Sequence, residues 1–286
     1  MSSSPTSAPS TTTRVAVVGH VEWVEFVELD HVPKPGEIVY ATPTLAVAAG
    51  GGAVAAVALA RWAGNCIFYC ALGDDDLGHR AKAELESRGV DVRAAWRKAP
   101  QRRAITMVDA QRERTITVIG ERLVAHEADA LGWTDLAACD GVYITGGDAG
   151  AIRLARQAKA AVSTARILPL LRLANIPLDA LVSSANDPAE RYQPGELSPE
   201  PRIVVRTDGG KGGTFVEAGA IHHYAAVPAT VSGDTYGAGD TFAAGLTYAL
   251  GHGRPPGDAI AEASARAAEV LAWRGPYPPA QNANPR

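Results

Sequence analysis

The sequence predicts an α/β fold, in which a doubly wound, mostly parallel sheet is flanked by helices and carries a small β-sheet lid. Short apolar runs that end in glycine, such as Arg14–Gly19 and Asn65–Gly73, alternate with segments of helical length. Strands that are buried on both faces of a parallel sheet have this continuous apolar pattern. The chain has 286 residues and is 47% hydrophobic, which suffices for one large core.

The segments of the main sheet follow a β-α-β rhythm. Uninterrupted apolar runs indicate strands, glycines mark their ends, and alanine- and leucine-rich stretches between them indicate helices. The expected strands lie at 14–19, 65–73, from 89–91 onward, and at 141–147, 166–170, 180–183 and 201–210. The expected helices lie at about 50–63, 79–88, 149–162, 240–250 and 257–272.

Two β-rich segments interrupt this rhythm. The first, 24–47, alternates only in part and is broken at Pro33–Gly36, which indicates an irregular hairpin outside the main sheet. The second consists of two β-rich runs around a polar turn. We expect the segments of about 23–47 and 101–120 to pair into one small sheet that forms the lid.

The two ends of the chain differ from the domain between them. Residues 1–13 are rich in Ser, Thr, Pro and Ala and carry no charge, which predicts a disordered tail without a signal peptide and hence a cytoplasmic protein. One domain is expected over 14–276. The Pro-rich residues 277–286 predict an irregular tail.

Composition excludes several classes of function. A formal net charge of −4 offers no broad basic field, so we expect neither nucleic acid nor a membrane surface as a partner. The longest uncharged apolar run, Leu45–Ala60, is too short to span a bilayer. Of the three cysteines, Cys66 and Cys70 lie in an apolar run and Cys139 is remote, which predicts buried thiols rather than a zinc site or a disulfide.

The stretch Val231–Leu246 indicates the chemistry. Gly237 and Gly239 precede Asp240 and an Ala/Leu-rich run, so a loop is expected to become a helix here. The free N–H groups of a helix N-terminus form an anion site that glycine lets a phosphate approach. A carboxylate there would repel phosphate, but it suits a base that deprotonates an attacking hydroxyl. The stretch therefore indicates phosphoryl transfer; the alternative is that Asp240 merely caps the helix.

Two other glycine clusters compete as phosphate sites. Gly209–Gly213 is not a P-loop, because no Ser or Thr follows Lys211 and the first glycine of that motif is missing. Gly50–Ala55 fits a dinucleotide fingerprint, with acids at Asp74–Asp76 about twenty residues on. A hairpin intervenes before this cluster, so a close contact between helix and sheet explains its glycines equally well. The three aspartates suit a helix cap better than a metal site.

The chain from about Val15 to Pro276 resembles the PfkB or ribokinase-like family of carbohydrate kinases. The specific part is the signature Asp234-Thr235-x-Gly237-Ala238-Gly239-Asp240. Further matches are Gly50-Gly51, Leu72-Gly73-Asp74-Asp75-x-x-Gly78, Arg88-Gly89-Val90-Asp91 and Glu113-Arg114-Thr115. The resemblance implies ATP as phosphoryl donor, Mg²⁺ as bridging ion and a monovalent cation such as K⁺ near the signature.

The resemblance also implies a role for each matching residue. Asp240 is expected to be the catalytic base, and the anion hole is expected to consist of Gly237, Ala238 and Gly239. The residues expected to bind the nucleotide are Asn186, Thr207, Gly210, Gly212 and Thr235. Those expected to bind the substrate are Glu22, Gly50, Gly51, Arg114 and Asp240. The metal ions are expected beside Glu190 and Asp234, the latter also shaping the loop.

Three positions depart from the family pattern. Val24 stands where a sugar-binding Asn or Asp is common, although Glu22 nearby can still donate or accept a hydrogen bond. Ala55 replaces a usual Asn, and Asn186 and Glu190 are separated by one residue more than in the Asn-x-x-Glu element. The identity of the sugar is therefore open.

We predict ATP-dependent phosphorylation of a hydroxyl group on a small sugar or sugar-like substrate. One alternative is a nucleoside kinase, in which Trp23 would stack on the base; another is a non-catalytic regulator that binds sugar or nucleotide. His20, at the end of the first strand, could face the ligand crevice or belong to the core. The exposed edges expected in a lid sheet suggest a homodimer formed through the lid.

Overall fold

The computed structural model describes residues 13–111, 113–229 and 232–279. A nine-stranded sheet has the order β13-β12-β11-β10-β9-β8-β1-β4-β5, with β12 and β13 antiparallel at one edge and the other strands parallel. Its strands are β1 (Val15–Val18), β4 (Cys66–Gly73), β5 (Val90–Arg97), β8 (Gly141–Ile144), β9 (Ala160–Thr164), β10 (Ala180–Ser184), β11 (Ile203–Thr207), β12 (Gly213–Glu217) and β13 (Ala220–Tyr224). The predicted fold class is confirmed.

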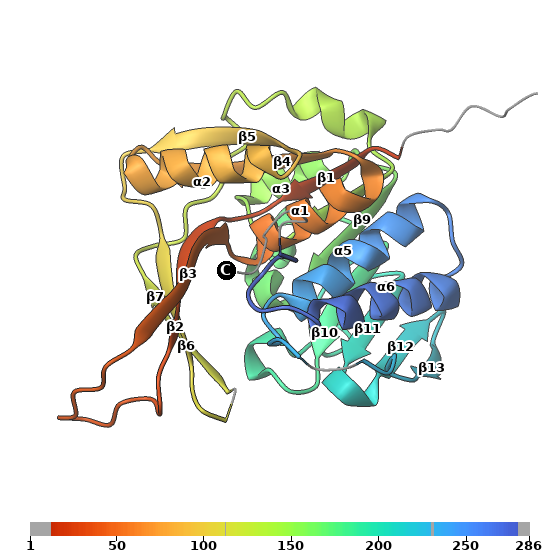
Figure 1. Ribbon diagram of the computed structural model, residues 1–286. Coiled ribbons are helices and arrows are strands. Elements are labelled where there is room, and N and C mark those ends of the chain that lie inside the picture. Colours follow the sequence, from red (N-terminus) through yellow and green to blue (C-terminus); the bar gives the residue numbers. More distant parts are fainter. Residues whose placement is uncertain (1–12, 112, 230–231, 280–286) are drawn as a thin grey trace, which may run out of the picture.

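Helices cover both faces of this sheet (Figure 1). They are α1 (Gly51–Ala63), α2 (Asp76–Ser87), α3 (Ala149–Ala155), α4 (Leu168–Ala174), α5 (Ala238–Gly251) and α6 (Pro256–Val270). One core lies between the sheet and α1, α2, α5 and α6, and a second lies between the sheet and α3 and α4. Every residue of β1 and β4 is buried, which explains why their sequences are apolar throughout.

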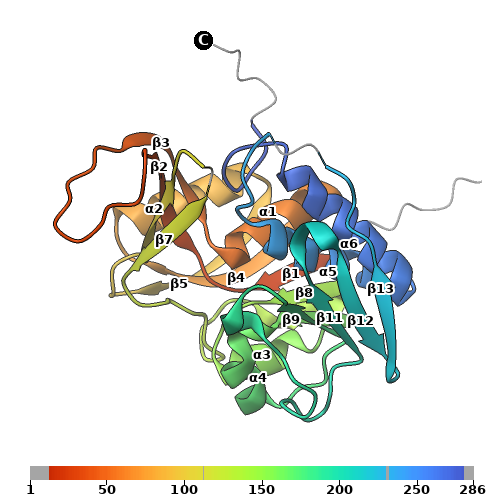
Figure 2. The ribbon, with the colours of Figure 1, turned by 90° about the horizontal axis from the view of Figure 1, so that it is seen from below.

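A second sheet stands beside the first (Figures 1 and 2). Its strand order is β3-β2-β6-β7, with β2 and β6 parallel and the other pairs antiparallel. The strands are β2 (Glu22–Glu28), β3 (Thr42–Ala49), β6 (Arg103–Val108) and β7 (Arg114–Ile119). The two interrupting segments thus pair with each other, as the sequence predicts.

Two predicted elements of the main domain are wrong. The helix expected over 149–162 ends at Ala155, and its last residues belong to β9. The strand expected over 166–170 is a short 3-10 turn, η2 (Ala165–Ile167), followed by α4. Alanine favours helices, but Ala160–Thr164 is buried on both faces, and a short buried strand has no alternation that separates it from a helix. Pro169 suits the first turn of α4.

Three further expectations concern the two tails of the chain, membrane-spanning helices and the cysteines. Residues 1–12 of the predicted N-terminal tail and residues 280–286 of the predicted C-terminal tail lie outside the described residues. Among the helices of the described residues, none combines the length and apolar character that crossing a membrane requires. Cys66, Cys70 and Cys139 are free and buried, as predicted.

Candidate active site

The N-terminal ends of α1 and α5 meet at the carboxylate of Asp240. Asp240 lies in the first turn of α5, and a Cβ built on Gly51, the first residue of α1, would be 2.6 Å from Oδ1 of Asp240. Only glycine therefore leaves room for this carboxylate at the start of α1. The N-cap of α5 is Gly237, and the helix has no side-chain cap within the described residues. The alternative in which Asp240 is the cap is thus wrong.

The position of Gly237 requires a glycine for two structural reasons. Its φ angle of 77° lies in the left-handed region, and a Cβ there would be 2.8 Å from Cγ1 of Val54 in α1. Gly239 differs, because a Cβ on it would meet no described atom within 4 Å. The loop is consequently tight against α1 at Gly237 and open at Gly239. Ala238 begins α5 between them.

The environment of Asp240 raises the pKa of its carboxyl group to about 6. Burial is the main cause, since it penalises the charged form, and the negative charge of Glu190 adds to it. A hydrogen bond that the Tyr143 hydroxyl donates to Oδ1 at 3.3 Å acts in the opposite direction, as do the charges of Arg166 and Arg114. The carboxyl is therefore mainly ionised at pH 7 to 8, with a pKa suited to accepting a proton.

Glu22 lies beside the same two glycines. It begins β2, is 8% exposed, and its Cγ would be 3.2 Å from a Cβ on Gly50. Nε of Arg102 lies 2.7 Å from its Oε1, an ion pair in which that N–H is not aligned with the oxygen. The structure thus brings together the predicted substrate residues Glu22, Gly50, Gly51 and Asp240.

The lid reaches this site through Arg114. Its guanidinium lies 6.0 Å from the ring centroid of Tyr236, within the signature motif, and its positive charge lowers the pKa of Asp240. Tyr236 in turn contacts Phe26 of the lid, with ring centroids 5.0 Å apart, and its hydroxyl accepts a hydrogen bond from the Gly50 N–H at 3.4 Å. Arg114 thus lies within electrostatic reach of Asp240, and its role in binding substrate stays a prediction.

Trp23 and the two substituted positions are buried. Trp23 is 5% exposed, and the Arg80 guanidinium covers its ring at 4.5 Å. Val24 and Ala55 are both 0% exposed and belong to the core. None of the three presents a surface on which a base or a sugar could lie.

The predicted nucleotide residues lie at the other end of the site, around the ends of β10 and β11. Nδ2 of Asn186 donates to Oδ1 of Asp208 at 3.1 Å, and Thr207 Oγ1 donates to the Ser183 carbonyl at 3.2 Å. A surface cavity of about 200 Å³ opens here. It is lined by Ala185, Arg206, Asp208, Lys211, Gly213, Thr214 and His223.

The glycines of this loop differ in what they contact. A Cβ on Gly212 would be 2.1 Å from the Tyr224 carbonyl oxygen, whereas one on Gly210 would meet no described atom within 4 Å. Gly212 is therefore required for chain packing, and Gly210 borders open space. Thr235 is exposed in the signature loop, at some remove in sequence from these residues.

The two predicted metal residues have different surroundings. Oε1 of Glu190 lies 2.8 Å from Nε of Arg166, and the charge of Glu190 acts on Asp240. The oxygens of Asp234 accept the N–H groups of Tyr236 and Gly275, each at 2.8 Å, and so tie the motif to the segment after α6. Asp234 thus shapes the loop.

The acidic side chains of the site could hold Mg²⁺ only together with the phosphates of a bound nucleotide. Within the described ranges no three His, Cys, Asp or Glu side chains are grouped to hold a metal. Mg²⁺ is usually held by one or two carboxylates together with substrate phosphates and water. Glu190 supplies such a carboxylate near Asp240 despite the extra residue after Asn186.

Sequence reasoning missed four polar residues of the site: Tyr143, Arg102, Arg122 and Arg166. Tyr143 lies on β8 and Arg166 is the second residue after β9, so both are near the carboxyl ends of parallel strands, where ligands bind. This signal could have identified Arg166 if residues 160–164 had been recognised as a strand. Arg102 and Arg122 flank the second lid hairpin, and no local pattern marks them.

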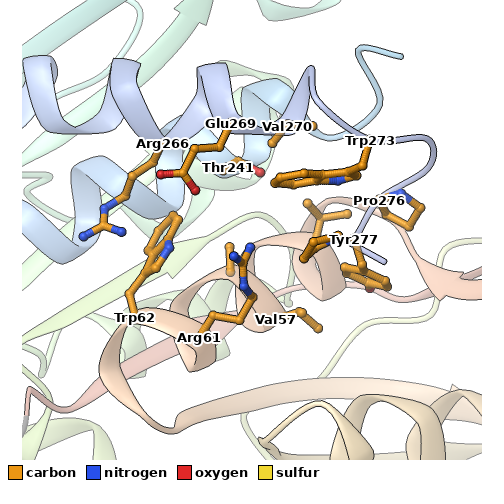
Figure 3. Close-up of a pocket in the computed structure, with 13 residues that line it drawn as sticks. Val57, Arg61, Trp62, Thr241, Arg266, Glu269, Val270, Trp273, Pro276 and Tyr277 are labelled. Atoms are coloured by element: carbon orange, nitrogen blue, oxygen red, sulfur yellow. The ribbon is translucent and has the colours of Figure 1, made fainter. Parts of the chain in front are cut away.

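A second hollow lies among α1, α5, α6 and the C-terminal segment (Figure 3). The Arg266 guanidinium covers the Trp62 ring at 4.2 Å, and Arg61 lies 5.8 Å from the Trp273 ring centroid. The volume of the hollow, about 10 Å³, is only enough for a single water molecule. This hollow is therefore a seam between helices rather than a substrate site.

Known proteins share the family and the fold of this chain. A model of the pfkB family of carbohydrate kinases matches residues 12–183 and 170–283. Ribokinase from Thermotoga maritima has 21% sequence identity and a TM-score of 0.75, with 91% of this chain and 93% of that chain covered. Arabidopsis thaliana ribokinase complexed with ribose and ATP has 21% identity and a TM-score of 0.69, with coverages of 92% and 94%. Escherichia coli phosphofructokinase-2 in complex with fructose-6-phosphate has 15% identity and a TM-score of 0.70, with coverages of 91% and 94%. At these identities the solved structures show a shared fold.

Proposed function

Because the chain belongs to the pfkB family and is a carbohydrate kinase, we propose that it transfers the γ-phosphoryl group of ATP to a hydroxyl group of a small sugar-like molecule, with Asp240 as catalytic base. The observation that carries this proposal is the position of the Asp240 carboxylate, held between the first residues of α1 and α5 with a pKa of about 6. A purely structural aspartate would gain nothing from such burial.

The proposed reaction uses the Asp240 side chain and the backbone N–H groups at the start of α5. Asp240 takes the proton of the sugar hydroxyl as that oxygen attacks the γ-phosphorus, and the bond from phosphorus to the bridging oxygen of ADP breaks. The N–H groups of the N-cap Gly237 and of Ala238 and Gly239, the first two residues of α5, would hold the charge on the transferred group. The open space in front of Gly239 supports this role, because a phosphoryl group needs room to approach the backbone.

The nucleotide would lie along the loop that contains Thr207, Gly210 and Gly212, next to Asn186. The cavity of about 200 Å³ supports that placement through its lining residues Asp208, Lys211 and Gly213, which are neighbours in the sequence of the three loop residues. Glu190 would hold Mg²⁺ together with the phosphates, where the ion would neutralise negative charge as the γ-phosphoryl group is transferred. A K⁺ ion beside Asp234 and Thr235 stays a prediction of the sequence.

The lid would close over the sugar. Glu22 and Arg114 extend from lid strands to the surroundings of Asp240, so lid closure would complete the sugar site and exclude water. The nucleoside alternative has less support, because Trp23 is buried beneath Arg80. A non-catalytic regulator has no use for a base with a raised pKa.

A homodimer through the lid is also proposed. All six residues of the edge strand β7 are exposed, and Ile116, Val118 and Ile119 are among them at 41% to 43%. Exposed apolar edge strands are prone to pairing, which a partner subunit would satisfy. The molar mass in solution, measured by light scattering, distinguishes a dimer from a monomer or a tetramer.

The central experiment compares two Asp→Asn variants. ATP consumption is first measured over pentoses, hexoses, sugar acids, sugar phosphates, inositols and nucleosides to find the best substrate. Asp240→Asn should then lower kcat by about 10²- to 10⁴-fold, the usual contribution of a general base. Asp258→Asn is the matched control, since Asp258 also lies in the first turn of a helix but in α6. Near wild-type turnover by Asp240→Asn would disprove the assignment.

A further inference from the structure

Four arginines lie around the active site, Arg102, Arg114, Arg122 and Arg166, and two of them have acidic partners. Arg102 pairs with Glu22 at 2.7 Å, and Arg166 pairs with Glu190 at 2.8 Å and with Asp187 at 2.5 Å. Within the described ranges the side chains of Arg114 and Arg122 have no ion pair and no hydrogen bond, but Arg114 is exposed and lies over the Tyr236 ring, whereas Arg122 is partly buried.

Arg122 is held at the site by the chain that leaves the lid. Gly120, which follows β7 with a φ of 90°, places the chain beside Arg102, where a Cβ would be 3.8 Å from its Cα. The charges of Arg102 and Arg166 lower the pKa of Arg122, and those of Glu22 and Asp240 raise it, so all four groups lie within electrostatic reach. Burial is the largest cause of its lowered pKa. A desolvated cation beside two others is unfavourable unless an anion accompanies it.

His20 is a second unsatisfied group at the same place. It is 5% exposed, its Nδ1 has no hydrogen-bond partner among the described atoms, and its Nε2 lies 3.9 Å from Oε1 of Glu22. Burial and the charges of Arg122, Arg102 and Arg166 lower its pKa to about 3, so the imidazole is neutral at physiological pH. It can therefore donate a hydrogen bond without adding charge.

The position of Arg122 favours the sugar over the nucleotide as the source of the anion. Arg122 follows the lid strand β7, and its charge acts on His20 just after β1, whereas the nucleotide loop follows β11, four strands away from β1 in the sheet. Val24 and Ala55, where the family resemblance implies side chains that bind hydroxyl groups, are apolar and fully buried. This side of the site is thus poor in contacts for a neutral sugar and rich in positive charge.

We propose that the substrate carries an anionic substituent, a phosphate or a carboxylate, which binds Arg122 beside His20 while its hydroxyl group faces Asp240. This inference rests on the proposed kinase function and specifies its substrate class. Arg102 and Arg166 add to the positive field while they remain paired with Glu22 and Glu190. Phosphate and carboxylate share the geometry that a guanidinium recognises with two parallel hydrogen bonds.

The test compares sugar phosphates, sugar acids and the matching neutral sugars as substrates of the wild-type enzyme. Either the sugar phosphates or the sugar acids should have a higher kcat/KM than the matching neutral sugars. Which of the two sets does so identifies the substituent. Arg122→Gln should raise KM for that substrate by about 10- to 100-fold and leave KM for ATP unchanged, because charge-assisted hydrogen bonds have about this strength. Arg122→Lys should restore part of the loss.

The control is Arg254→Gln, which removes the same charge beyond the far end of the 14-residue α5, roughly 20 Å from Asp240. Its KM values should be those of the wild type. Since Arg122 has no described partner to lose and is disfavoured by burial and by neighbouring positive charge, Arg122→Gln should not lower the melting temperature.

Direct binding of the same compounds, measured by calorimetry, separates this inference from the kinase function. Neutral sugars turned over as well as anionic ones, with Arg122→Gln unaffected, would overturn the inference and leave the kinase function intact. Anionic sugars that bind through Arg122 without being phosphorylated would uphold the inference and overturn the function. A change in KM for ATP alone would assign Arg122 to the nucleotide and overturn the inference.

Discussion

The hydroxyl of Tyr143 donates a hydrogen bond to Oδ1 of Asp240 at 3.3 Å, which joins β8 to the first turn of α5. Burial and the charges of Asp240 and Glu190 raise the pKa of Tyr143 well above its ordinary value, so this hydroxyl stays protonated throughout the working range of pH. It is a permanent donor to the carboxylate and stabilises the ionised form of Asp240.

Removing this donor should shift the pH dependence of the reaction. In Tyr143→Phe the pKa of Asp240 rises further, and the base is protonated at higher pH. The acid limb of the kcat profile, expected near pH 6 in the wild type, should move upward by up to about one pH unit. A profile measured from pH 5 to 9 with saturating substrates tests this. An unmoved acid limb would mean that this bond does not act on the base.

Asp240 should lower the stability of the enzyme at neutral pH. Its folded pKa, about 6, lies above the ordinary aspartate value of 3.8, so the folded state holds more protons between these values and stability falls as pH rises from about 4 to 6. Asp240→Asn should therefore raise the free energy of unfolding at pH 8 by about 1 to 3 kcal/mol. Denaturant titrations at pH 8 and pH 4 check the prediction, because the gain should disappear at pH 4. A gain that is equal at both pH values, or that also occurs in Asp258→Asn, would contradict it.

Gly51 should be essential for turnover although it carries no functional group. The Cβ of Gly51→Ala would lie 2.6 Å from Oδ1 of Asp240 and must displace that carboxylate. Because a displacement of about 1 Å can cost 10²-fold in rate, kcat should fall by about that factor. Gly257→Ala is the control: Gly257 is the second residue of α6, and a Cβ there would meet no described atom within 4 Å. Equal losses in both variants would indicate a general effect on helices.

Glu190 should affect both the metal and the base. In Glu190→Gln the concentration of Mg²⁺ needed for half-maximal rate should rise about tenfold, since one carboxylate ligand is lost. The acid limb of the kcat profile should move to lower pH, because the charge of Glu190 raises the pKa of Asp240. Glu196→Gln, which removes a carboxylate paired with Arg172, serves as control. A change in the Mg²⁺ requirement without a shift of the acid limb would show that Glu190 does not act on Asp240.

Local sequence patterns were enough to predict those parts of the structure whose defining residues are consecutive in the chain. The start of α5 follows from glycines that alone tolerate a left-handed φ and close contact, and Asp240 follows them directly. The same kind of pattern failed at residues 160–164, where a buried alanine-rich strand resembles a helix. The predicted roles of Glu22, Arg114 and the nucleotide residues depended on family resemblance, and the structure adds their positions.

By itself the sequence determined the α/β fold, the lid and the turn that presents Asp240, because these depend on apolar periodicity and on backbone preferences of neighbouring residues. Only the tertiary structure decided that Tyr143, Arg122 and Arg166 join that aspartate. They come from β8, from the exit of the lid and from the end of β9, segments separated by about twenty residues or more along the chain. The order of strands in the sheet brings them together, and pKa values follow from that proximity and burial, which no local pattern encodes.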